Sequence, residues 1–191
     1  MDLTLSDSKV LEHLIVDSLK RTIGEDGAEK TFAELRLKNE KSNSVLHSLN
    51  EILVKSGYGL KTKNVFEKLG EELSSRLDVK IRPDNINLLK EGSENVLVEV
   101  INRFDVPLVF EVTLEDRDNF VPIVFNKREG AYFNSFSVES IIDTGDVGRF
   151  HFKLGWEGQQ RKIPGTTLFV LVRSNEVEGL NWIGKLRVNL S

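Results

Sequence analysis

Apolar side chains in the first 77 residues recur at steps of three and four, which is the spacing of one face of a helix. Four segments show this period. Their apolar positions are Val10, Leu11, Leu14, Ile15, Leu19 and Ile23; then Ala28, Phe32 and Leu35; then Val45, Leu46, Leu49, Ile52 and Leu53; and last Val65, Phe66, Leu69, Leu73 and Leu77. Helices this short are not stable alone in water, so we expect them to pack as a compact four-helix unit.

Capping residues indicate where these helices begin and end. Ser6 or Ser8 can accept hydrogen bonds from the first turn of the first helix, and Gly24 suits the left-handed conformation that ends it. The second helix then runs from about 25 to 38, and Thr62 opens the fourth.

After residue 78 the pattern changes to alternation of apolar and polar positions, the signature of strands. Strands are expected at 79–89, 95–102, 108–114, 121–126, 131–138, 149–154, 166–173 and 182–190, with a hairpin turn at 127–130. Seven or eight short strands without a long helix between them predict an antiparallel β-sandwich and not a parallel α/β sheet. The sequence therefore predicts an α+β protein of two domains, all-helical over 1–77 and β over 78–191.

Two stretches of the β half resemble immunoglobulin-like β-sandwich modules of the CARDB or fibronectin-III type. The first begins with Ile-Arg-Pro-Asp-Asn-Ile-Asn-Leu at 81–88 and continues through Glu-Gly at 91–92 into the strand at 96–102. The second is the glycine turn and strand at 141–152. The resemblance covers about residues 79–190 and implies an immunoglobulin-like fold, with a binding or spacing role more often than catalysis.

The helical half resembles winged helix-turn-helix regulators at 31–35, 42–50 and 55–58. That resemblance makes 42–55 the recognition helix. It implies contacts to DNA bases from the side chains of Ser42, Asn43, Ser44, His47 and Ser48. The near-neutral charge of this half argues against DNA binding, because phosphate contacts normally supply most of the affinity.

Charge and composition narrow the functional classes. The 191 residues carry 26 basic and 30 acidic side chains, a formal net charge of −4, and neither half is basic, so nucleic acid is a disfavoured partner although the DNA-binding alternative stays open. The absence of cysteine excludes disulfides, thiolate metal sites and cysteine nucleophiles. No apolar run reaches the roughly 18 residues that cross a bilayer, so no membrane contact is expected. The first residues do not form a signal peptide, which favours the cytoplasm.

Catalytic and metal-binding motifs are not recognisable. His13, His47 and His151 lie on different predicted elements without zinc-site spacing, and no nucleophile elbow is present. We therefore expect no enzyme activity, no cofactor and no metal. The acidic cluster at 115–119 is the best calcium candidate, since Ca²⁺ binds carboxylate and amide oxygens. Its alternative is a polar turn in which Arg117 compensates the acids.

The stretch 155–165 is a long polar connection between two predicted strands. Loops of a sandwich gather at the ends of the sheets and carry recognition, and we expect 90–94 and 115–119 at the same end. Trp156 continues the parity of the preceding strand and is expected in the core. The candidate partner-binding residues are Gln159, Gln160, Arg161 and Lys162.

The leading hypothesis from the sequence is a non-enzymatic interaction protein. In it, the β-sandwich binds a protein partner through its end loops, and the helical domain mediates assembly, including a homo-oligomer, or a second contact. The alternatives are a DNA-binding transcription regulator whose β half is a sensor or dimerisation domain, and a carbohydrate binder. Carboxylates are plentiful in the β half, but no pair can be placed at a working separation from the sequence.

Overall fold

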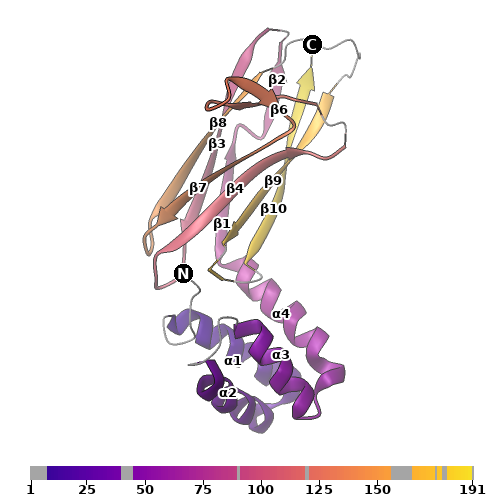
Figure 1. Ribbon diagram of the computed structural model, residues 1–191, viewed down its shortest axis with the longest axis vertical. Helices are drawn as coiled ribbons and strands as arrows, with labels where there is room; N and C mark the ends of the chain where they lie inside the picture. The colour runs from indigo at the N-terminus through magenta and orange to yellow at the C-terminus, as the bar shows by residue number, and fades with distance from the viewer. Residues whose placement is uncertain are drawn as a thin grey trace.

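The computed structural model describes residues 8–39, 45–89, 91–118, 121–155, 165–174, 176–177 and 180–190. The helices come first along the chain and the strands follow (Figure 1). The helical elements are α1 (Lys9–Ile23), α2 (Glu25–Asn39), α3 (Val45–Lys55), the short 3₁₀ helix η2 (Gly59–Lys61) and α4 (Thr62–Ser75). The strands are β1 (Leu77–Arg82), β2 (Asn85–Leu88), β3 (Ser93–Asn102), β4 (Leu108–Asp116), β5 (Val124–Asn126), β6 (Ala131–Phe133), β7 (Ser135–Ile142), β8 (Val147–Gly155), β9 (Gly165–Ser174) and β10 (Asn181–Leu190).

The four predicted helices are confirmed, and the ends of α1 follow the capping signals. Ser8 is the N-cap of α1, and its Oγ accepts a hydrogen bond from the Leu11 backbone N–H at 3.1 Å. Gly24 ends α1 with a φ of 83°. The prediction that Leu77 belongs to the apolar face of the fourth helix is wrong, because α4 ends at Ser75 and Leu77 begins β1. Leu77 is buried, and burial at the expected position does not distinguish the end of a helix from the start of a strand.

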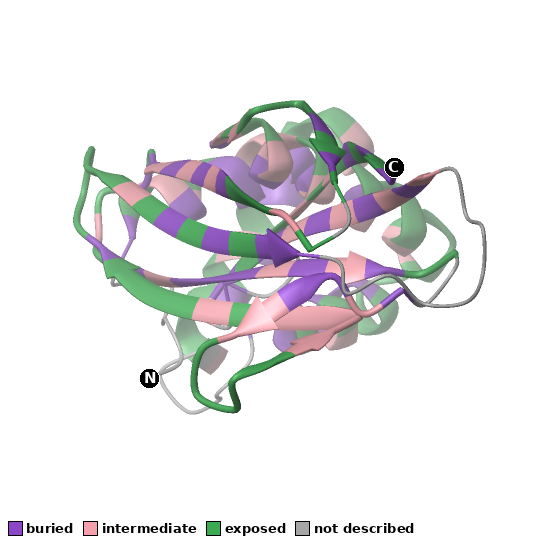
Figure 2. Ribbon diagram, turned by 90° about the horizontal axis from the view of Figure 1, so that it is seen from above, coloured by how far each residue is buried: buried purple, intermediate pink, exposed green. Residues whose placement is uncertain are grey.

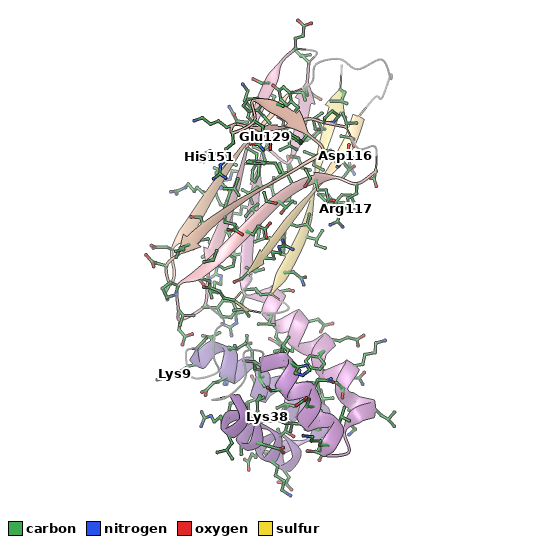
Figure 3. All side chains as sticks on the ribbon, in the orientation of Figure 1. Lys9, Lys38, Asp116, Arg117, Glu129 and His151 are labelled. Carbon is green, nitrogen blue, oxygen red and sulfur yellow. The ribbon has the colours of Figure 1, made fainter. Side chains whose placement is uncertain are left out.

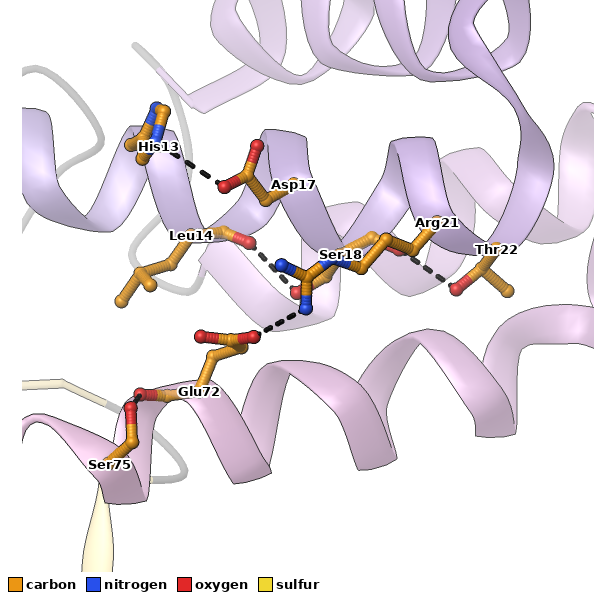
Figure 4. Close-up of polar contacts among 8 residues, drawn as sticks. All are labelled: His13, Leu14, Asp17, Ser18, Arg21, Thr22, Glu72 and Ser75. Carbon is orange, nitrogen blue, oxygen red and sulfur yellow. Dashed lines mark hydrogen bonds and ion pairs between the residues drawn. The ribbon is translucent and has the colours of Figure 1, made fainter.

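Polar contacts join α1 to α4 at the surface of the helical unit (Figure 4). The Arg21 guanidinium of α1 donates a hydrogen bond to the Glu72 carboxylate of α4 at 2.6 Å. Within α1, the Ser18 and Thr22 hydroxyls donate to the backbone carbonyls of Leu14 and Ser18, each at 2.8 Å. The Arg21–Glu72 pair is exposed and adds little stability, so the apolar stripes hold the helices together.

The strands form two five-stranded sheets. The first sheet has the order β1-β3-β8-β5-β6, and the second has β2-β10-β9-β4-β7. The described pairings are antiparallel except for β2 and β10, which run parallel with Asn85 opposite Arg187. The prediction of a β half after residue 78 is therefore confirmed. The predicted seven or eight strands, all antiparallel, are ten strands in the structure, and one of their pairings is parallel.

The additional strands arise where one predicted strand divides between the two sheets. The segment 79–89 breaks at Pro83, so that β1 pairs with β3 in the first sheet and β2 pairs with β10 in the second. The segment 131–138 breaks at Asn134, after which β7 leaves β5 and β6 and pairs with β4. Apolar and polar residues alternate in the same way before and after the point where the chain passes from one sheet to the other. The sequence pattern alone therefore does not reveal this change of sheet.

The buried faces of both sheets belong to one apolar core. Phe136 of β7 and Phe152 of β8 meet across the sheets, with ring centroids 6.4 Å apart and ring planes at 82°. Buried and exposed residues alternate along the strands, as Figure 2 shows. In β8 this alternation places Phe150 and Phe152 in the core and His151 in solvent, as predicted.

Asn102, at the end of β3 near the helices, is a buried polar residue with all of its amide atoms paired. Its Nδ2 donates to the carbonyls of Val106 at 2.8 Å and Ile142 at 2.9 Å, and its Oδ1 accepts from the Phe104 N–H at 3.0 Å. The side chain is fully buried. Asn102 therefore fixes the β3–β4 loop against the end of β7.

The helical unit lies at one end of the two sheets, and the β3–β4 loop contacts it there (Figure 1). The Ser8 Oγ donates to Asp105 Oδ1 at 2.6 Å, and the Lys9 backbone N–H donates to Asp105 Oδ2 at 3.0 Å. A carboxylate from the β unit thus caps the N-terminus of α1, where the helix dipole favours negative charge. On α4, the Ser74 Oγ donates to the Asn181 carbonyl of β10 at 3.0 Å.

The cap also sets the ionisation of Asp105. Burial by itself raises the pKa of this carboxyl, but hydrogen bonds from Ser8, from its own backbone and from the Lys9 and Val10 amides outweigh it and hold the pKa below the ordinary value. The charged form therefore stabilises the fold above the ordinary Asp pKa of about 3.9, and this contribution is lost as the pH falls through the lower folded pKa.

We expect Asp105→Ala to lower the free energy of unfolding by about 1 kcal/mol at pH 7, because the first turn of α1 loses the carboxylate that accepts from the Ser8 hydroxyl and the Lys9 N–H. The difference from the parent protein should shrink on acidification and vanish once the pH is below the lowered folded pKa of Asp105. Urea unfolding at several pH values measures both effects. Asp84→Ala, at another exposed aspartate of the β unit, is the control. A constant difference from pH 7 to pH 2 would contradict the assignment.

Candidate functional site

The end of the sheets opposite the helical unit is where several connections meet. Ser93 at the start of β3 is paired with Gly155 at the end of β8. Asp116 at the end of β4 is paired with Leu168 of β9, and β9 begins at Gly165. The described parts of the connections around 91–93, 116–118, 155 and 165 therefore lie at one end, as the sequence predicted for these loops. We call this the distal end.

Asp116 is the buried polar centre of the distal end. Its side chain is fully buried at the end of β4, beside the exposed Arg117 (Figure 3). Its carboxylate accepts hydrogen bonds from the Thr166 hydroxyl at 2.9 Å, the Val121 N–H at 3.0 Å and the Asp118 N–H at 3.1 Å. One side chain thus fixes the end of β4, the start of β9 and the chain entering β5 relative to one another.

A shallow polar hollow of about 260 Å³ lies above this centre. It opens widely to solvent, and its lining carries a carboxylate, a guanidinium, two hydroxyls and an amide. The residues that line it are Asp118, Gly165, Thr166, Thr167, Arg187, Val188 and Asn189. Asn189 extends the polar surface onto β2, because its Nδ2 donates to Asn87 Oδ1 at 2.8 Å. The hollow presents both hydrogen-bond donors and acceptors, and it is open to solvent. Such a surface suits a polar segment of a partner protein better than a small apolar ligand, which needs an enclosed pocket.

Aromatic and charged side chains continue from the hollow along the outer face of the second sheet. Arg117 and Lys185 both lie over the ring of Phe169, each 5.4 Å from its centroid. Further along, Arg173 donates to the Glu111 carboxylate at 2.6 Å, and this hydrogen bond holds the pKa of Glu111 below its ordinary value. The Phe169 ring thus lies between two cations, an arrangement in which the ring face attracts positive charge.

The predicted partner-binding residues Gln159, Gln160, Arg161 and Lys162 lie outside the described residues, as does Trp156. The structure places the two ends of their connection, Gly155 and Gly165, at the distal end. Gly165 lines the hollow. A Cβ at this position would lie 2.7 Å from the Val188 carbonyl, so the absence of a side chain lets β9 approach β10 closely.

Of the residues of the DNA-binding alternative, the structure describes His47 and Ser48, and these two do not share an exposed surface. Ser42, Asn43 and Ser44 lie outside the described residues, and His47 is exposed with its Nε2 3.4 Å from a Glu51 carboxylate oxygen. Ser48 is 1% exposed, and its hydroxyl has no hydrogen-bond partner among the residues that the structure describes, so it faces the core and not a base edge.

The connection between α3 and α4 also differs from that of a winged helix. A turn and η2 fill residues 56–61, all of which are described, and neither forms a strand of a wing. The expectation of a winged-helix domain from the resemblance is therefore not supported.

The acidic cluster at 115–119 is divided by the strand geometry. Glu115 lies on the outer face of β4 and pairs with Arg117 at 2.8 Å, whereas Asp116 points inward to its three donors. Adjacent residues of a strand face opposite sides, so these two carboxylates do not converge on one calcium ion. Asn119 lies outside the described residues. Within the part of the chain that the structure describes, no group of three His, Cys, Asp or Glu side chains could hold a metal ion.

The sequence did not single out Asp116 as a buried residue, although the signal was present. Val112 and Leu114 are buried in β4, and Asp116 continues their parity inward. The same argument places Asn102 inward after Val98 and Val100 in β3. Tertiary contacts decide which polar residues at inward positions near a strand end become buried centres.

No described helix has the length and apolar character needed to cross a membrane. No family model matches the chain. It is 32% identical over 108 residues to a protein of Leptospira interrogans described as "Uncharacterized protein in sph 3'region", which corresponds to 56% of this chain and 53% of that protein. The chain thus spans about half the length of this curated relative.

Solved structures give only distant likenesses. A FixG-related protein from Vibrio parahaemolyticus is 12% identical with a TM-score of 0.42, and the match covers 61% of this chain and 97% of that chain. A conjugative transposon lipoprotein from Bacteroides eggerthii is 13% identical with a TM-score of 0.41, covering 61% of this chain and 99% of that chain. Likenesses at this level show neither a family nor a function for this chain.

Proposed function

We propose that this chain is a non-enzymatic interaction protein that binds a protein partner at the distal end. The observation that supports this most is the convergence of several connections on the buried Asp116, beneath a wide polar hollow. Loops fixed by a buried network lose less conformational freedom on binding, which favours affinity. The hollow is open and polar, as expected for a partner chain that lies on the surface.

Strand order supports an immunoglobulin-like assignment for the β unit within this proposal. The order β1-β3-β8-β5 corresponds to the A-B-E-D order of one immunoglobulin sheet, and β10-β9-β4 corresponds to G-F-C of the other. Recognition by loops at one end of the sheets is a common use of that architecture. The helical unit lies at the other end, so it can mediate assembly or a second contact while the distal end is occupied.

Photo-crosslinking tests the proposal. A photoreactive phenylalanine analogue is introduced at position 161 or 187, and at 63 and 143 as controls, because Lys63 and Asp143 are exposed on the helical unit and on the turn near it. In cells that make the native chain, we expect adducts of one defined mass from 161 and 187 and weak or no adducts from 143 and 63.

A loop variant sharpens the result. Changing Gln159, Gln160, Arg161 and Lys162 to alanine should reduce the adduct from position 187 about tenfold or more, because a few anchor residues carry most of an interface's energy. Equal adducts from all four positions, or an unchanged adduct in the loop variant, would refute the distal end as the binding surface.

A further inference from the structure

The outer face of the first sheet is basic, although the chain as a whole is acidic. Lys80 and Arg82 point outward from β1, and Arg149, His151 and Lys153 point outward from β8. All five side chains are exposed. We call these five residues the basic face. It lies on the other side of the β unit from Arg117, as the position of His151 in Figure 3 shows.

The two basic strands flank β3, which supplies the main acidic group of this face. In the register, Lys80 and Arg149 lie on either side of Glu99. The Glu99 carboxylate is 3.3 Å from Arg149 and 3.7 Å from Arg82, and its side chain is 16% exposed. One largely covered carboxylate is thus shared by two arginines. Lys80 and Lys153 form no ion pair with a described residue, so the face keeps an excess of positive charge.

Aromatic side chains border the basic face on β5 and β6. Phe125 and Tyr132 are paired across these strands with ring centroids 5.2 Å apart, and Lys153 Nζ lies 5.3 Å from the Phe125 centroid. Tyr132 lies directly over Gly155, where a Cβ would approach its hydroxyl to 2.2 Å. The missing side chain at Gly155 therefore lets the tyrosine ring lie close to the sheet beside the cations.

The outer face of the second sheet carries more acidic groups among its cations. There, Arg173 is paired with Glu111 and Arg117 with Glu115, Glu139 lies beside Glu111 in the register, and Lys185 and Arg187 of β10 are also exposed. The formal charge of −4 thus averages over faces of different character. An overall charge argues against nucleic acid only where the charge is evenly distributed, and here it is not.

We propose that the basic face binds single-stranded nucleic acid, with phosphates on the cations and a base stacked at the Phe125–Tyr132 pair. Outward residues of one strand recur about every 6.6 Å, so Arg149, His151 and Lys153 form a row on β8 in which two cations flank a histidine and can follow an extended backbone. A basic surface next to aromatic rings is the combination that binds single strands without sequence preference. This surface is separate from the distal end and does not depend on the function proposed there.

The first test is the salt dependence of binding to a fluorescein-labelled oligothymidylate of 12 nucleotides, followed by fluorescence anisotropy. If three or four phosphates are neutralised, raising the salt from 50 to 200 mM should weaken binding about 20- to 50-fold. Absence of binding at 50 mM salt overturns the proposal.

Charge-reversal variants locate the surface. Lys80→Glu with Lys153→Glu should weaken binding at least tenfold and flatten the salt dependence, because two phosphate contacts are lost. Lys61→Glu with Lys68→Glu makes the same change in net charge at exposed positions of the helical unit and should have little effect. If both double variants lose oligonucleotide binding equally, binding depends only on the overall charge, and the assignment of binding to the basic face is overturned. Circular dichroism and thermal unfolding show whether each variant is folded.

The aromatic pair distinguishes nucleic acid from an acidic protein as the occupant. Phe125→Leu and Tyr132→Leu keep the charges, and each should weaken oligonucleotide binding about fivefold or more if a base stacks there. Poly-glutamate of matched charge should compete poorly. If poly-glutamate competes as well as the oligonucleotide and the leucine variants bind normally, the face recognises acidic protein and the nucleic-acid proposal fails.

Discussion

Asp116→Ala is expected to lower the free energy of unfolding by about 3–5 kcal/mol. The carboxylate is fully buried and accepts hydrogen bonds from Thr166, Val121 and Asp118. Alanine leaves these donors without their acceptor, and a buried unpaired donor costs about 1–3 kcal/mol. Urea unfolding followed by tryptophan fluorescence measures the change.

Two further variants distinguish the loss of the Asp116 hydrogen bonds from the loss of an aspartate in general. Asp116→Asn keeps one acceptor oxygen and should cost less than alanine. Asp143→Ala removes an exposed aspartate at the other end of the sheets and should change stability by less than about 0.5 kcal/mol. A loss below about 1 kcal/mol for Asp116→Ala would show that the distal connections do not depend on this side chain.

Asn102→Ala is expected to cost about 3 kcal/mol, because it leaves the Phe104 N–H and the carbonyls of Val106 and Ile142 without partners in the core. The effect should extend to the helical unit. The loop that Asn102 fixes presents Asp105 to the first turn of α1. Hydrogen exchange of the first amides of α1 should therefore accelerate in this variant, alongside the loss measured by urea unfolding.

Asn95→Ala is the matched control, because this asparagine is exposed on the same strand, β3. Asn102→Asp should be at least as harmful as alanine, since a carboxylate oxygen would then face two carbonyl oxygens. If Asn102→Ala destabilises the protein while α1 exchanges at its normal rate, the loop holds its position without Asn102 and the coupling is refuted.

The sequence predicted the helices well because each carries a strong apolar stripe and a local signal at its end. Ser8 and Gly24 act at the ends of α1 through contacts within a few residues, so no knowledge of the rest of the fold is needed. The positions of the strands were also predicted, but the sheet to which each strand belongs was not. Pairing of β1 with β3 and of β2 with β10 depends on residues far apart in the sequence, and nothing local at Pro83 specifies it.

The candidate site could be predicted only in outline. That the connections near 116 and 155–165 share one end followed from simple strand order, and the contact between Asp116 and Thr166 bears this out. The roles of individual residues did not follow, since Asp116 belonged to a cluster interpreted as a turn or a calcium site. Likewise, a count of charges over each half of the chain did not indicate a basic face. The basic residues of β1 and β8 come to lie on one face only because both strands pair with β3 in the same sheet.

The parallel pairing of β2 with β10 has a mechanical consequence. The helical unit continues through α4 and β1 into the start of β2, while β10 runs alongside β2 toward its own far end at Leu190. Tension applied between the helices and the end of β10 pulls these two strands in opposite directions along their length. The pairs from Arg187–Asn85 to Leu190–Leu88 then bear the load together, in shear, and do not open one after another. The β2–β10 pairing therefore gives this edge of the β unit a resistance to pulling that pairs opening one after another would lack.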